Sequence, residues 1–176
     1  MILALSGSLN PSSINRAVLR AAASAGARDG VLVTVDDSVR ALPHFDPALE
    51  EAPPEAVVRF RAACESAAGV LVAVPEYAFG IPGAFKNALD WTVGSGSLYR
   101  KPVAVLGVAP PGRGMHVREA LRLVLRALDA DDDYHCVPVA RSDLREDGEV
   151  DDPRILAELA GVVRDLALRA NPASAA

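Results

Sequence analysis

The sequence predicts an α/β protein with a doubly wound, five-stranded parallel sheet in the order 2-1-3-4-5 and helices on both faces. Five short runs of aliphatic residues alternate along the chain with five stretches of helical periodicity. The runs are almost continuously apolar, as in strands that are covered on both faces, so right-handed helical crossovers must connect them. Periodicity does not determine strand order, but five strands suit this order.

The first half of the chain supplies three strands and two helices. Residues 2–5 are apolar and end at a turn of serine and glycine, and a helix follows from about Ile14. A second apolar run, 31–35, is followed by a loop rich in proline, aspartate and alanine. That loop ends at Pro54, which suits the first turn of the next helix. The third strand is predicted over 70–74.

The second half continues the alternation. A helix is predicted over 84–91, and a fourth strand follows over 103–108. A long amphipathic helix begins at about Met115. A fifth strand over 134–139 and a closing helix over 155–168 complete the pattern.

The length favours one domain. At 176 residues the chain can bury roughly 70% of the surface that its unfolded form exposes, so its fold needs no disulfide bonds or structural metal for stability. No internal repeat or interdomain linker is visible. We predict a single domain over residues 1–170 and a frayed tail over 171–176.

Composition excludes several classes of protein. The net charge is −5, the isoelectric point is near 5.2 and the 18 basic residues are scattered, so the basic stripe that nucleic acid requires is missing. Two isolated cysteines, Cys64 and Cys136, are too few for a disulfide framework or a zinc site and fit the reducing cytoplasm. No apolar run approaches the roughly 20 residues of a membrane span, and the N-terminus lacks a basic leader, so we expect neither membrane insertion nor export.

The segment after the first strand is a candidate phosphate site. Gly7 permits a sharp turn, and short polar side chains follow it up to a helix start, where free N–H groups and the positive dipole end favour an anion. The polar residues are Ser8, Asn10, Ser12, Ser13 and Asn15. The same residue types also cap helices, and the residues alone leave the two interpretations equally weighted. Neither GxxxxGKS/T nor GxGxxG is present.

The stretch from Val74 to Trp91 is the one around which the chain is organised. A strand ends at Pro75, a loop punctuated by proline and glycine presents residues 76–79, and a helix follows. In an open parallel sheet, ligands bind in the crevice beyond the carboxyl ends of the strands. Tyr77 and Phe79 are poorly placed for one core stripe, so a role beside a ligand is favoured over packing.

These motifs resemble those of a known family. The chain is similar to the NAD(P)H-dependent FMN reductases, a flavodoxin-like family that includes azoreductases, quinone reductases and chromate reductases. The similar segments are Gly7-Ser8-Leu9 with Ser13 and Asn15, Pro75-Glu76-Tyr77, Pro82-Gly83 and the KNALDW block from Lys86 to Trp91. The resemblance covers nearly the whole chain, and the block from PEY to KNALDW is its most specific part.

The resemblance implies which residues hold the FMN cofactor. The first loop and the start of its helix would bind the phosphate, the loop after strand three would follow the ribityl chain and ring, and the loop after strand four would close the other edge of the flavin. The implied residues are Ser8, Asn10, Ser13, Ile14, Asn15, Pro75, Glu76, Tyr77, Ala78, Phe79, Pro111, Gly112, Arg113 and Gly114. NADPH or NADH would be the co-substrate, and Arg113 is a candidate for contact with a dinucleotide phosphate.

Three positions depart from the family's pattern. Its members usually have Arg in place of Asn10, Asn in place of Ala78 and Ser in place of Gly80, and their loop after strand four reads more like SxGxxGG. The missing arginine removes a charge-assisted contact to the phosphate. Either FMN is held less tightly, or Arg16 compensates.

The implied function is that of an FMN-dependent oxidoreductase. It would pass a hydride from NAD(P)H to FMN and then reduce a quinone, azo compound, free flavin or similar small-molecule acceptor. Two alternatives share the fold: a flavodoxin-type electron carrier, which normally needs an acidic docking face, and a flavin-binding sensor without turnover, which only the three departures favour. The flavin carries the chemistry, so no catalytic side chain is expected.

The remaining polar residues suggest no other site. His44, His116 and His135 lie on different predicted elements, and GxSxG is absent, so no catalytic triad can be assembled. The acidic run over 129–133 is most simply a solvated loop, and we predict no metal site. Glu76 is expected to brace its loop or to face a partner subunit, not to act as a catalytic acid.

The resemblance also implies a homodimer or a dimer of dimers, with the flavin near the interface. The helix from Met115 carries an apolar stripe that Leu123 and Leu125 widen beyond one core-facing side. This stripe and the exposed face of the 84–91 helix would supply the contacts.

Overall fold

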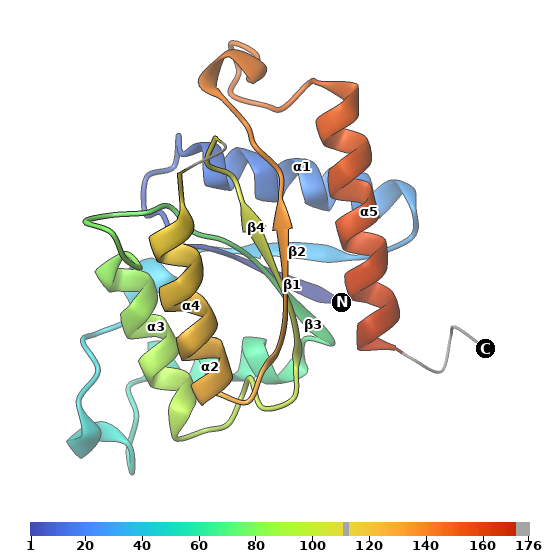
Figure 1. The fold of residues 1–176 in the computed structure, drawn as a ribbon. Coiled ribbons are helices and arrows are strands. Elements are labelled where there is room, and N and C mark those ends of the chain that lie inside the picture. The colour runs from blue at the N-terminus through green and yellow to red at the C-terminus, as the bar shows by residue number, and fades with distance from the viewer. Residues whose placement is uncertain (111–112, 172–176) are drawn as a thin grey trace.

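The computed structural model describes residues 1–110 and 113–171, and within them the chain forms the predicted sheet (Figure 1). Five parallel strands lie in the order β2-β1-β3-β4-β5, which confirms the predicted fold class. The strands are β1 (Ile2–Ser6), β2 (Val33–Asp36), β3 (Gly69–Ala73), β4 (Pro102–Gly107) and β5 (Asp131–Cys136). The helices are α1 (Ile14–Arg28), α2 (Glu55–Ser66), α3 (Gly83–Val93), α4 (Met115–Ala127) and α5 (Pro153–Ala170). Apart from Asn171, the predicted tail falls outside the described residues.

Side chains alternate along each central strand between two apolar cores, one on each face of the sheet. In β1, Ile2 and Ala4 belong to the core beneath α1 and α5. Leu3 and Leu5 belong to the core beneath α2, α3 and α4. β3 and β4 alternate in the same way. The apolar runs in the sequence are therefore continuous because both faces of these strands are buried.

The loop after β1 lies directly against the end of β3. The N–H of Gly7 donates to the carbonyl of Ala73 at 2.9 Å. A Cβ atom on Gly7 would lie 2.7 Å from Cγ1 of Val74 and 3.0 Å from its Cα, so glycine is required for this close approach. The switch point between β1 and β3 thus brings their loops side by side, as predicted.

The fifth strand begins earlier than predicted. We predicted a strand over 134–139 and a solvated loop before it, but Asp131 to Asp133 pair with Pro102 to Ala104 of β4. Aspartate disfavours strands, yet strand propensity depends on context, and backbone pairing at the edge of the sheet decides here. Arg169 of α5 lies 2.9 Å from a carboxylate oxygen of Asp131 and 3.6 Å from one of Asp133.

The two helices expected to supply a partner surface differ in exposure. α4 buries Val117, Leu121 and Leu125, so Leu125 belongs to the core-facing stripe, whereas Leu123 is 58% exposed. The outward face of residues 84–91 of α3 is half-buried and consists of Ala84, Lys86, Asn87 and Asp90. The apolar side chains of Phe85, Ala88, Leu89 and Trp91 are buried, whereas Val93 at the end of the helix is 61% exposed.

Candidate functional site

A cavity of about 950 Å³ lies at the carboxyl ends of β3 and β4. The start of α1, the β3–α3 loop (residues 74–82) and the described residues of the β4–α4 loop (108–110 and 113–114) contribute to its wall. This volume suits a cofactor-sized ligand. The predicted cofactor residues on the wall are Ile14, Asn15, Pro75, Glu76, Phe79, Arg113 and Gly114. Those not on the wall are Ser8, Asn10, Ser13, Tyr77 and Ala78, while Pro111 and Gly112 lie outside the described residues.

The β1–α1 loop (residues 7–13) is held in shape by its own polar side chains. Ser13 caps α1, because its hydroxyl accepts a hydrogen bond from the N–H of Asn15 at 3.2 Å. The hydroxyl of Ser8 accepts from the N–H of Asn10 at 3.3 Å. The side-chain oxygen of Asn10 accepts from the N–H of Ser12 at 3.0 Å. The capping interpretation therefore holds for these side chains, and the loop that they shape ends at the N-terminus of a 15-residue helix.

Asn15 provides the test of whether this end of the cavity fits a phosphate. Its side chain is only 9% exposed, and its Oδ1 atom has no hydrogen-bond partner among the described residues. A buried polar atom without a partner is costly, so water or a ligand must satisfy this position. Rotation of the amide exchanges its oxygen and nitrogen, so the same position can present N–H donors to an anion. The residues present therefore fit the phosphate of FMN.

The β3–α3 loop contains a tight turn with a strained backbone. Tyr77 and Gly80 exchange two backbone hydrogen bonds, with N–O distances of 3.1 and 3.0 Å. The two residues between them, Ala78 and Phe79, have φ angles of 49° and 59°. Positive φ at both central positions is the pattern of a type I′ turn. The turn leaves Tyr77 57% and Phe79 74% exposed, so neither ring packs in the core.

Glu76 ties the β3–α3 loop to α4. Its Oε2 atom accepts hydrogen bonds from the backbone N–H groups of His116 and Val117, at 3.0 and 3.1 Å. The preceding N-cap residue, Gly114, has no side chain to satisfy these donors. The rings of Phe79 and His116 meet edge to face at 4.8 Å. Glu76 thus braces the two loops that bound the cavity.

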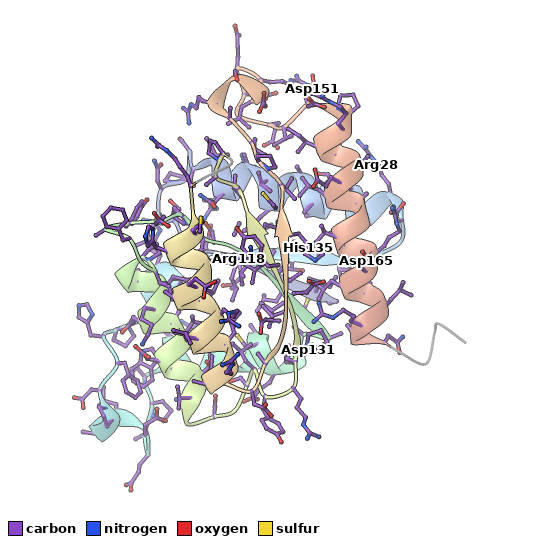
Figure 2. The ribbon with its side chains drawn as sticks, in the orientation of Figure 1. Arg28, Arg118, Asp131, His135, Asp151 and Asp165 are labelled. Atoms are coloured by element: carbon purple, nitrogen blue, oxygen red, sulfur yellow. The ribbon has the colours of Figure 1, made fainter. Side chains whose placement is uncertain are left out.

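The α4 side of the cavity carries two arginines. Arg113 is exposed, and its N–H donates to the carbonyl of Pro110 at 3.0 Å. Arg118, labelled in Figure 2, lies on α4 beside β5, and its guanidinium is 4.3 Å from the ring centre of Tyr134. Burial raises the pKa of Tyr134, whose hydroxyl occupies the space beside Gly107 that a Cβ would fill. No sequence pattern indicated this part of the wall, because tertiary packing alone brings Arg118 and Tyr134 together.

Arg16, the residue expected to compensate for the arginine missing at position 10, is already paired with a carboxylate, but its buried Nε atom has no hydrogen-bond partner among the described residues. Its guanidinium forms a bidentate ion pair with Asp37, with one N–O distance of 2.7 Å. The hydrogen bonds raise the pKa of Arg16 and lower that of Asp37. The charge of Arg16 is therefore already compensated by a carboxylate.

The KNALDW block supports the structure and does not line the cavity. The side chain of Asn87 accepts from the N–H of Phe45 at 2.7 Å and donates to the carbonyl of Pro43 at 2.9 Å. The indole N–H of Trp91 donates to the same carbonyl at 2.9 Å. Lys86 and Asp90 form an ion pair one helical turn apart. The most specific part of the sequence motif thus fastens the segment after β2 to α3.

The sheet order and a cavity at the carboxyl ends of β3 and β4 define a flavodoxin-like protein with a candidate ligand site. Within the described residues, none of the helices is sufficiently long and apolar to cross a membrane.

The chain belongs to the NADPH-dependent FMN reductase family, which matches residues 1–132. It is therefore an oxidoreductase of the NADPH-dependent FMN reductase family. It is 36% identical over 128 residues to a quinone reductase of Pseudomonas putida, covering 70% of this chain and 68% of that protein. It is 32% identical over 127 residues to a 2-hydroxy-1,4-benzoquinone reductase of a Burkholderia species, with the same shares covered. Among solved structures, the flavoenzyme NAD(P)H:acceptor oxidoreductase of Paracoccus denitrificans has a TM-score of 0.76 and 26% identity, covering 97% of each chain.

Proposed function

We propose that this chain binds FMN in the cavity and uses NADPH or NADH to reduce a quinone or a similar small acceptor. The observation that carries the proposal is the cavity at the carboxyl ends of β3 and β4, with the buried amide oxygen of Asn15, unpartnered among the described residues, at the N-terminus of α1. The names of the quinone reductases to which the chain is similar supply the class of acceptor.

Each loop has a role in this proposal. A bound FMN would supply the chemistry for hydride transfer from the nicotinamide and for electron transfer to the acceptor. The N-terminus of α1 holds the phosphate through its free N–H groups and positive dipole end. The β3–α3 loop and Gly114 would supply backbone N–H groups to the flavin ring, which would stabilise negative charge on the reduced ring. Glu76 holds the β3–α3 loop against the start of α4 by accepting hydrogen bonds from its backbone N–H groups, and so fixes the relative position of the β3–α3 and β4–α4 loops.

An anaerobic absorbance experiment tests this function. The purified protein is mixed with FMN, separated from free flavin, and then given NADPH or NADH, followed by a benzoquinone. Flavin bands that bleach on addition of the nucleotide and return with the quinone are the expected result. Bound flavin that stays oxidised would contradict the proposal and favour an electron carrier or a sensor.

Arg113 is the proposed contact for the phosphate groups of the nicotinamide dinucleotide. It is an exposed cation on the cavity wall, at the start of α4. Arg113→Ala should raise the KM for NADPH about tenfold, the amount expected from losing one charge-assisted hydrogen bond. Arg122→Ala is the matched control, since Arg122 lies nearby on α4 but pairs with Glu119. Unchanged NADPH and NADH kinetics in the Arg113 variant would exclude this role.

We also propose a homodimer, or a dimer of dimers, formed through the α4 side of the cavity. Phe79, Met115 and Leu123 are 74%, 64% and 58% exposed, which is unusual for large apolar side chains. Light scattering at micromolar concentration should give at least twice the mass of one chain. Leu123→Glu should lower the mass to that of a monomer, whereas Leu168→Glu, on α5 and 48% exposed, should not.

A cytoplasmic location is proposed on the basis of the cysteines. Both are free thiols, Cys64 buried and Cys136 exposed. Burial raises the pKa of Cys64 to about 12, so this thiol stays protonated and unreactive. Free thiols are typical of a reducing compartment.

A further inference from the structure

Three arginines surround the β1–α1 loop, and their partners differ. Arg16 is compensated by Asp37. Arg40 donates to the carbonyl of Leu9 and lies close enough to Asp37 to lower the pKa of that carboxyl. Arg141 donates from Nη1 to the carbonyl of Ser12 at 3.1 Å.

Arg141 differs from the other arginines of its own segment. Arg145 is paired with Asp147 at 3.1 Å, and Arg154 with Asp152 at 2.8 Å. Within the residues that the structure describes, the one interaction that the side chain of Arg141 makes is its bond to a backbone carbonyl. Its positive charge is therefore not compensated by a protein carboxylate.

The segment that carries Arg141 is fixed beside the cavity. The carboxylate of Asp143 accepts from the N–H of Ala140 at 2.8 Å, which closes a turn over 140–143. Val139, just before this turn, lines the cavity together with Asn15. Arg141 itself is exposed and is not on the wall of the cavity, but its guanidinium reaches the backbone of Ser12, just before the N-terminus of α1.

Asn10 does not provide an alternative contact of equal strength. It is neutral, and its side-chain oxygen is engaged with the N–H of Ser12. A guanidinium has five N–H donors in a planar fork that matches phosphate geometry.

We propose that Arg141 supplies the guanidinium contact to the flavin phosphate and so makes the site select FMN over riboflavin. This proposal rests on the function proposed above, because it assumes that FMN occupies the cavity. In this proposal, the positively charged side chain that binds the phosphate comes from the segment between β5 and α5 and not from position 10 of the β1–α1 loop, where this chain has Asn10. Arg141 is thus a determinant of cofactor specificity.

The test measures binding, not turnover. Dissociation constants for FMN and for riboflavin are obtained from quenching of flavin fluorescence, for the wild type, Arg141→Ala and Arg141→Lys. Arg141→Ala should weaken FMN binding roughly tenfold or more and leave riboflavin binding unchanged, because only FMN carries the phosphate. Arg141→Lys keeps the positive charge but lacks the planar guanidinium, so its affinity for FMN should fall between those of the wild type and Arg141→Ala. Arg145→Ala is the matched control from the same segment and should bind both flavins like the wild type.

A second variant tests whether a positive charge in the β1–α1 loop can replace that of Arg141. Asn10→Arg in the Arg141→Ala background should restore most of the lost FMN affinity. Equal weakening of both flavins by Arg141→Ala would show that Arg141 only supports the loop and would overturn the proposal, as would unchanged FMN binding. If the wild type binds FMN and riboflavin equally well, the role of Arg141 is excluded but the proposed function is not. If the wild type binds neither flavin, both the role of Arg141 and the proposed function are excluded. Circular dichroism shows whether Arg141→Ala folds, and if it does not, the FMN and riboflavin affinities of Arg141→Lys decide between these outcomes.

Discussion

Ala78 and Phe79 hold a backbone conformation that residues with a side chain usually avoid. Left-handed geometry costs an L-residue roughly 1–2 kcal/mol, and both residues adopt it within one turn. Asparagine tolerates this region better than alanine. The asparagine that the family usually has at position 78 therefore suits the backbone of the turn, whatever its side chain contributes to the flavin.

Replacing Ala78 with asparagine should stabilise the protein. Because the turn already requires positive φ, Ala78→Asn should raise the free energy of unfolding by about 0.5–1 kcal/mol. The measurement is urea unfolding followed by circular dichroism. Ala157→Asn is the matched control: Ala157 is exposed on α5, where asparagine is a poorer helix former than alanine, so the same exchange should destabilise. Equal effects at both positions would contradict the strain argument.

At the scale of the element, α4 depends on a residue from another loop for its start. Its N-cap, Gly114, makes no side-chain hydrogen bond, and Glu76 supplies the missing acceptor. α5 is capped locally instead: Asp152 accepts from the N–H of Arg154, and its hydrogen bonds with Arg154 lower the pKa of Asp152 to about 2. The two helices therefore use the same chemistry, but only the cap of α4 couples distant parts of the site.

Removing the carboxylate of Glu76 should destabilise α4 and, with it, the cavity wall. Glu76→Ala should lower the free energy of unfolding by about 1–2 kcal/mol, as the loss of a helix cap does. Glu76→Gln retains an oxygen acceptor without the charge and should cost less. Urea unfolding gives the size of the effect, and hydrogen exchange at the amides of His116 and Val117 gives its location. Unchanged protection of these two amides in Glu76→Ala would rule out the capping role.

The ion pair between Arg16 and Asp37 joins α1 to the end of β2 and should produce an acid-sensitive contribution to stability. The folded-state pKa of Asp37 lies below its unfolded value of about 3.9. The contribution is thus fully present above the unfolded pKa and is lost as the pH falls through the folded pKa. Asp37 is largely exposed, so solvent screens the pair and the effect should be small.

The comparison of the wild type with Asp37→Asn across pH tests this linkage. The wild type should be the more stable protein above about pH 5, and the difference should shrink as the pH falls below about 4. Asp165→Asn, at an exposed position of α5 labelled in Figure 2, is the control and should show no such convergence. A difference that stays constant down to about pH 2 would contradict the linkage.

At the scale of the whole molecule, β5 is an open edge of the sheet. Unpaired edge strands can recruit other chains, and proteins often protect them with charged side chains. Asp131 and Asp133 supply such charges, and Arg169 partly compensates them from α5. The low strand propensity that misled the sequence prediction is thus consistent with protection of this edge.

Neutralising the edge should promote aggregation. The double variant Asp131→Thr/Asp133→Thr keeps the strand and raises its propensity, but removes two charges from the edge. Light scattering during incubation below the unfolding temperature should rise faster than in the wild type. Asp147→Thr/Asp151→Thr changes the net charge equally in the segment before α5 and should aggregate at the wild-type rate. If both double variants aggregate at similar rates, the faster aggregation is due to the change in net charge and not to the edge strand.

The sequence was sufficient for features that depend on local pattern. Continuous apolar runs separated by helical stretches predicted the fold, and the Gly7 turn and the PEY segment predicted which loops meet. The sequence was insufficient where the local structure depends on contacts with residues that are distant in the chain. The start of β5 follows from pairing with β4, and the cap on α4 comes from Glu76, far earlier in the chain. The position of Arg141 beside Ser12 likewise follows from the packing of the segment after β5, which has no repeated pattern.

The hydrogen bonds of Asn87 and Trp91 to the Pro43–Phe45 segment bear on how members of this family are recognised. Because these side chains secure the scaffold and do not line the cavity, a chain could retain KNALDW after losing every group that holds the phosphate. The signature then identifies the architecture and does not indicate whether the cofactor is carried. Screening genomes for active reductases should therefore weigh residues 7–15 and their surrounding arginines above the more conspicuous block.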